Sequence, residues 1–168
     1  MSTITRFWNQ PCKPYRNFQV VFTLLTLNFV FPAIGYSFDP ATSLASFSQV
    51  NNLMGGGAYP FNESDSHLWR HLAAANVMTL GLMCGLLQVN VFRFWPVLLP
   101  LTCLKMYAAL SFGIDYFFNP GVPLFLGGFL LDGLSSLAFV FFASRARRAG
   151  QTYPESELVP QPREVNWL

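Results

Sequence analysis

The 168-residue chain is 52% apolar and only 11% charged, whereas soluble domains usually contain about 25% charged residues. Eighteen phenylalanines are more than a small water-soluble core can readily bury, so this composition argues against a soluble domain. A formal charge of +2 without a basic face argues against nucleic-acid binding, and three cysteines without a CxxC pair argue against a zinc site or a disulfide framework.

Four apolar segments are each long enough to cross a membrane, because about 20 helical residues span the hydrocarbon core of a bilayer. Apolar residues lie nearly all round each predicted helix, as lipid contact requires. We expect Pro32 to kink or end the regular part of the first segment, which is longer than the apolar stretch of an ordinary signal peptide. The sequence predicts an all-α, four-transmembrane-helix bundle, with spans at about 18–38, 68–88, 96–118 and 122–144.

Positive charges in the connecting segments predict the orientation of the bundle. The N-terminal tail (1–17), the short loop after the second span and the C-terminal tail (145–168) all contain arginine, whereas the loop 39–67 contains neither lysine nor arginine. Basic residues concentrate on the cytoplasmic side of membrane proteins. We therefore expect both termini in the cytoplasm, in a bacterial inner membrane, with the loop between the first two helices outside.

Two of the segments outside the spans have distinct compositions. The outer loop is too long to be a simple connection, and we expect a short helix at about 43–53 that caps the bundle. The tail beyond Gly150 is polar and proline-containing, which is typical of an extended or disordered segment.

One strongly polar residue falls near the middle of each span. At a rise of about 1.5 Å per residue, all four lie within roughly one turn of the bilayer midplane. The third and fourth helices are joined by a tight turn and must be antiparallel neighbours, so contact between the lysine and the aspartate is geometrically easy. The four residues are Asn28, Asn76, Lys105 and Asp132.

This polar layer has two main interpretations. Asparagine side chains hydrogen-bond across membrane helices, and a Lys–Asp pair neutralises two charges that are costly in lipid, so the layer can be structural. Alternatively, it forms a pocket for a ligand head group or a proton-handling pair. A third possibility is that Lys105 extends towards the cytoplasmic interface.

A second group of ionisable residues is predicted at the outer rim: Glu63, Asp65, His67, Arg70, His71 and Asp115. The two histidines are four residues apart and share a helix face, an arrangement that metal sites use. No HExxH motif or fixed third ligand accompanies them, so we predict helix capping and interfacial anchoring without a metal. A pH-dependent or head-group role stays open, and Arg70 is expected to face Asp115.

Gly81 and Gly85 form a GxxxG pattern in the second span. In an apolar helix this pattern permits close approach of another helix. It favours packing within the bundle over dimerisation.

The stretch from Trp69 to Asn76, WRHLAAAN, leads into Gly81 and places an arginine near the helix start with a glycine a few turns later. In this respect the second to fourth spans resemble the small bacterial four-helix membrane proteins called DoxX-like. The resemblance implies an accessory subunit or a protein without an assigned role.

Three classes of function follow from these observations. The first is an accessory or structural membrane subunit that contacts lipid and other subunits or copies of itself. The second is a binder or carrier of a quinone, isoprenoid or lipid, with its head group at Lys105 and Asp132. The third is a lipid-modifying enzyme, which the absence of cofactor motifs, a histidine-box array and a redox CxxC disfavours. No cofactor is identified from the sequence.

Overall fold

The computed structural model describes residues 3–57, 67–118 and 120–161. Every regular element within these ranges is helical and none is a strand, which confirms the all-α prediction. The elements are α1 (Thr3–Trp8), α2 (Lys13–Phe38), α3 (Pro40–Leu53), α4 (His67–Val89), η1 (Trp95–Val97), α5 (Leu98–Phe118), α6 (Pro123–Gly150) and η2 (Glu155–Glu157).

Four of the described helices, α2, α4, α5 and α6, are long and apolar enough to cross a membrane, with mean hydropathies of 1.7 to 1.9. They coincide with the four predicted spans. The first and last are longer than predicted, because α2 begins at Lys13 and α6 continues to Gly150. The first helix also continues through Pro32 to Phe38, so this proline does not end it.

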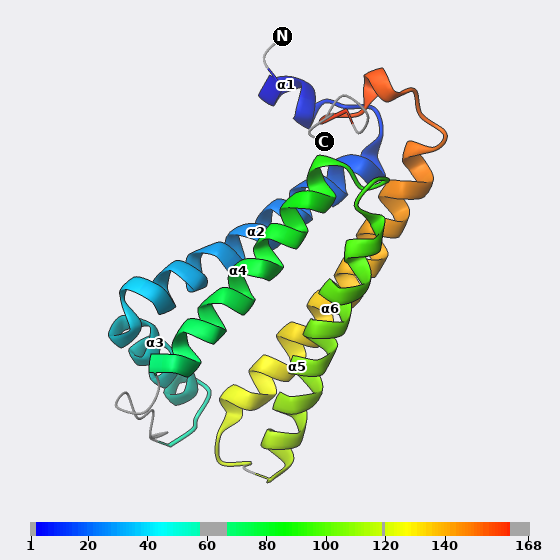
Figure 1. Cartoon of the computed structure of the whole chain (residues 1–168). Coiled ribbons are helices and arrows are strands. Elements are labelled where there is room, and N and C mark those ends of the chain that lie inside the picture. The colour runs from blue at the N-terminus through cyan, green and yellow to red at the C-terminus, as the bar shows by residue number, and fades with distance from the viewer. Residues whose placement is uncertain (1–2, 58–66, 119, 162–168) are drawn as a thin grey trace.

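The four long helices associate as two antiparallel pairs (Figure 1). Helix α2 packs along α4, α5 packs along α6, and α2 also contacts α6. The two pairs lie close together at the end of the bundle that contains α1 and η2, and they diverge towards the end that contains α3. We call these the terminal end and the α3 end of the bundle.

The buried core lies mainly towards the terminal end and is rich in aromatic rings. The ring centres of Phe18 and Phe22 are 4.4 Å apart, and that of Phe139 lies 5.7 Å from Phe22 and 6.3 Å from Phe29. These rings join α2 to α6. Because lipid is as apolar as the core, such helix contacts depend on close packing rather than on removal of apolar surface from water.

Helix α3 confirms the short helix expected at about 43–53, between the first two long helices. The Asp39 carboxylate accepts a hydrogen bond from the Thr42 backbone N–H (3.2 Å), and Pro40 occupies the first turn, where its missing N–H is not needed. At the other end, buried Asn51 accepts a hydrogen bond from the Leu124 N–H (3.2 Å) and donates one to the Gly57 carbonyl (2.7 Å). Helix α3 is therefore joined to the first turn of α6.

The C-terminal segment differs from the expected extended or disordered tail. Its described part folds back on the start of α2, with Leu158 fully buried and the Tyr15 hydroxyl donating to the Pro160 carbonyl at 3.0 Å. The Gln10 side chain accepts a hydrogen bond from the Val159 N–H (3.1 Å) and donates to its carbonyl (3.4 Å). A polar, proline-containing composition indicates an extended backbone, but it does not reveal that one leucine and a few backbone groups have partners elsewhere in the fold.

Candidate functional site

The predicted contact between Lys105 and Asp132 is present. Lys105 Nζ lies 2.5 Å from Asp132 Oδ1, and the two side chains form an ion pair between α5 and α6. Both are largely shielded, with 13% of each side chain exposed. The tight connection between α5 and α6 makes the helices antiparallel neighbours and brings residues 27 positions apart into contact.

A third helix contributes to this pair through an aromatic ring. Lys105 Nζ lies 4.8 Å from the ring centre of Phe29, which belongs to α2 and is buried among the core aromatics. A cation over the face of a phenyl ring is stabilised by the ring quadrupole, most strongly where water is excluded. The ion pair therefore lies where the α5–α6 pair meets α2.

The backbone around Asp132 is also engaged. Ser136 Oγ, which is buried, donates to the Asp132 carbonyl at 3.0 Å. This is a bond to the preceding helical turn, which satisfies a serine hydroxyl in an apolar environment. An ammonium carries three donors, and the hydrogen bond recorded for Lys105 Nζ is the one to Asp132. The site thus neutralises both charges and keeps some donor capacity on the lysine.

The structure does not bring the two asparagines of the predicted polar layer to this pair. Asn28 and Asn76 are both exposed on the surface of the bundle. Successive helical residues are about 100° apart around the axis, so Asn28 points away from the face occupied by its buried neighbour Phe29. Asn76 is two residues beyond buried Ala74 and likewise lies off the packed face. The prediction that all four residues converge in one layer is wrong. Residues at the same depth along their helices can still point in different directions around the helix axes.

A different polar cluster, not identified from the sequence, joins α2 to α4. Gln88 Nε2 donates to Thr26 Oγ1 (2.8 Å), Gln88 Oε1 accepts from Thr23 Oγ1 (2.7 Å), and Gln19 Nε2 donates to the Gln88 carbonyl (2.9 Å). The sequence does contain a pattern that indicates this cluster. Gln19, Thr23 and Thr26 are spaced four and three residues apart and therefore share one helix face. Each helix pair thus has its own polar connection.

Close packing accompanies both connections. A Cβ atom on Gly81 would lie 3.0 Å from Val30 Cγ2 on α2, whereas a Cβ on Gly85 would meet no atom within 4 Å. The first glycine of the GxxxG pattern therefore packs within the bundle, as predicted. In the other pair, a Cβ on Gly128 would lie 2.8 Å from the Phe112 ring and one on Gly113 would lie 3.1 Å from the Phe129 ring.

The second predicted group of ionisable residues is only partly described. Glu63 and Asp65 lie outside the described residues, as does the side chain of His67. His71 and Asp115 are exposed, on α4 and α5 respectively. Within the described part of the chain, no group of three potential metal ligands is present.

Arg70 does not form the predicted ion pair with Asp115. The two residues lie on α4 and α5, which belong to the pairs that diverge towards the α3 end (Figure 1). Arg70 instead lines a cavity of about 320 Å³ between α2, α3 and α4, together with Tyr36, Leu44 and Phe47. Its Nε atom is buried without a hydrogen-bond partner.

Comparison with protein-family models, curated proteins and solved structures finds no match. The DoxX-like resemblance therefore stays a prediction. The described geometry consists of an ion pair between two of four apolar helices, supported by an aromatic ring from a third.

Proposed function

We propose that this chain is a non-catalytic integral membrane protein, an accessory or structural subunit, in which the Lys105–Asp132 pair holds α5 and α6 together and orients them against α2. The observation that carries this proposal is the ion pair itself. Its recorded side-chain partners are internal: each charge has the other, and the ammonium also has the Phe29 ring.

Energetics favour a structural role for the pair. A charged side chain at the centre of a transmembrane helix costs about 2.5 to 3.5 kcal/mol on insertion scales, so either residue alone would oppose membrane insertion. Contact within one helical pair offsets both penalties at once. The same contact fixes the rotation of α5 relative to α6, since a charge turned towards lipid would lose its partner.

The surroundings of the pair support the same proposal. Three of the cavities along the described chain lie at the two ends of the bundle, and neither Lys105 nor Asp132 lines these three. Much of the apolar surface of α5 and α6 is exposed, including Leu99, Tyr107, Leu131 and Leu137. Such faces suit lipid, another membrane subunit or a second copy of this chain.

The orientation of the bundle belongs to this proposal. The basic ends of α2 and α6 and the Arg93 loop share the terminal end, and the positive-inside rule supports a cytoplasmic location for that end. We propose a bacterial inner membrane as its location, with α3 on the outer side.

A second candidate is a binder or carrier of a quinone, isoprenoid or other lipid whose polar head contacts the ion pair. One observation favours it: Lys105 Nζ has further donor capacity, and 13% of each charged side chain is exposed. Extraction of the protein from its native membrane into mild detergent, followed by native mass spectrometry with lipid identification, separates the two candidates.

We expect co-purifying membrane subunits or copies of this chain, and no stoichiometric small molecule that depends on the pair. The informative comparison is between the wild type and the Lys105→Met/Asp132→Leu double variant. A hydrophobic molecule bound at one per chain in the wild type and absent from a folded double variant would contradict the structural proposal and support the binder.

A further inference from the structure

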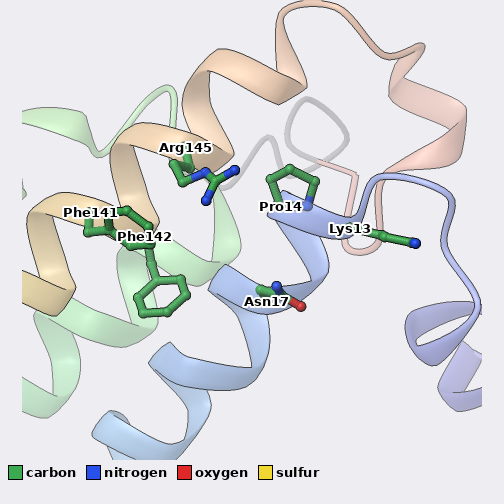
Figure 2. Close-up of a pocket in the computed structure, with 6 residues that line it drawn as sticks. All are labelled: Lys13, Pro14, Asn17, Phe141, Phe142 and Arg145. Carbon is green, nitrogen blue, oxygen red and sulfur yellow. The ribbon is translucent and has the colours of Figure 1, made fainter.

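Positive charge and apolar surface meet in a small cavity at the terminal end of the bundle, between the start of α2 and the end of α6 (Figure 2). The cavity has a volume of about 120 Å³. Its lining includes Lys13, Asn17, Phe142 and Arg145. Two cations from helices distant in sequence therefore border one hollow that is also lined by two aromatic side chains, Phe141 and Phe142.

The two cations are available for an external anion. Both Lys13 and Arg145 are exposed, and neither forms an ion pair with another residue of the described ranges. Figure 2 shows the Arg145 guanidinium extended towards Pro14, while the Lys13 amine points away from the cavity on a flexible stem. The Arg145 guanidinium carbon lies 5.3 Å from the ring centre of Phe141, which positions it beside an exposed aromatic.

An apolar groove continues from this cavity along α2. A second hollow, of about 560 Å³, shares Asn17 and Phe142 with the first and is also lined by Val20 and Val21. Its remaining lining residues are Trp8 and Arg16, and the Arg16 guanidinium donates to the Trp8 carbonyl at 2.9 Å. The shared residues make the two hollows adjoin. Along α2 the lining thus changes from the charged and polar residues 13–17 to Val20 and Val21, in the direction of the middle of the candidate span.

From this arrangement we propose a binding site for one anionic phospholipid. The Arg145 guanidinium holds the phosphate, and the Lys13 amine turns back on its flexible stem to join it. Asn17 supplies a polar contact near the glycerol backbone, and an acyl chain lies along Val20, Val21 and Phe142. Basic pockets between transmembrane helices recognise anionic lipid head groups in this way, and the planar guanidinium of arginine suits a phosphate. This inference rests on membrane insertion and is independent of the role of the Lys105–Asp132 pair.

The test uses the full chain in nanodiscs that contain phosphatidylglycerol and phosphatidylcholine, with retained lipids counted by native mass spectrometry. We expect the wild type to retain one phosphatidylglycerol in preference to phosphatidylcholine. The Lys13→Gln/Arg145→Gln variant should lose that preference by about fivefold per cation removed. If the wild type retains the two lipids equally, that result alone would overturn the proposal, whatever the variants show.

Arg93→Gln/Arg148→Gln is the matched control, because it removes two exposed positive charges from the same end of the bundle without touching either hollow. It should keep the lipid preference. An equal loss in both variants would overturn the site and indicate general surface charge. Excess inorganic phosphate distinguishes a lipid site from a simple anion site: we expect it to leave the bound phosphatidylglycerol in place, and displacement would contradict the acyl-chain groove.

Discussion

Lys105 Nζ lies 2.5 Å from Asp132 Oδ1 and 4.8 Å from the centre of the Phe29 ring. One nitrogen atom thus connects three of the four long helices. The remaining long helix, α4, is attached to α2 through the Gln88 hydrogen bonds. The bundle is therefore two polar-linked helix pairs that meet at an aromatic core, and each connection can be tested separately.

Replacing Gln88 with leucine should weaken the α2–α4 pair. The change removes the hydrogen bonds to Thr23 and Thr26, and hydrogen bonds between membrane helices contribute about 0.6 kcal/mol on average and up to about 1.7 kcal/mol each. We expect a loss of about 1 to 2 kcal/mol in the free energy of unfolding, measured by chemical denaturation in detergent micelles.

Asn28→Leu and Asn76→Leu provide the matching comparison. Both asparagines are exposed on the bundle surface, so their replacement removes a polar group from lipid contact without breaking a helix connection. We expect an unchanged or higher melting temperature for both variants. A drop as large as that of Gln88→Leu would show that the asparagines do join the helices.

Gly128→Ala should destabilise the α5–α6 pair, because the added Cβ would lie 2.8 Å from the Phe112 ring. Overpacking of this kind costs about 1 to 3 kcal/mol. Gly133→Ala, on the same helix, is the control, since a Cβ there meets no atom within 4 Å. The thermal melts of the two variants should therefore separate, and coincident melts would refute the close contact at Gly128.

Cys12 reports on the docked C-terminal segment. The thiol is fully buried in the same cluster as Leu158, and burial raises its pKa above the ordinary value by disfavouring the thiolate. A raised pKa lowers the fraction of Cys12 that is thiolate at a pH near 8. Alkylation of Cys12 should therefore be slower than that of a solvent-exposed cysteine, and should accelerate only at higher pH.

Leu158→Ser should release the segment and speed that alkylation, measured by maleimide mass shift in a Cys84→Ser/Cys103→Ser background. Tyr153→Ser is the control, because Tyr153 is exposed. Equal rates for wild type and Leu158→Ser would indicate that the segment does not shield the thiol.

Much of the fold could be predicted from hydropathy alone. Long, predominantly apolar runs identify the four long helices. The tight turn near Pro120 requires antiparallel neighbours, from which the Lys105–Asp132 contact follows. Asp39 and Pro40 are typical of a helix start, although the predicted short helix began a few residues later than α3 does.

Rotation and tertiary docking could not be predicted in the same way. The depth of Asn28 follows from counting residues, but its direction depends on which face of α2 accommodates Phe22 and Phe29. The docking of Leu158 depends on a buried cluster of residues distant in sequence and leaves no local sequence pattern. The position of Arg70 depends on the divergence of the two helix pairs, which periodicity does not encode.

The most direct test of the structural role of the ion pair is the free energy of unfolding of Lys105→Met, Asp132→Leu and the double variant in the same detergent. Removal of one partner leaves an uncompensated charge, which in buried pairs costs about 3 to 5 kcal/mol, whereas apolar replacement of both partners is often nearly neutral. We expect both single variants to be strongly destabilised and the double variant to unfold close to the wild type. Additive losses in the double variant, or single variants as stable as the wild type, would contradict this account of the pair.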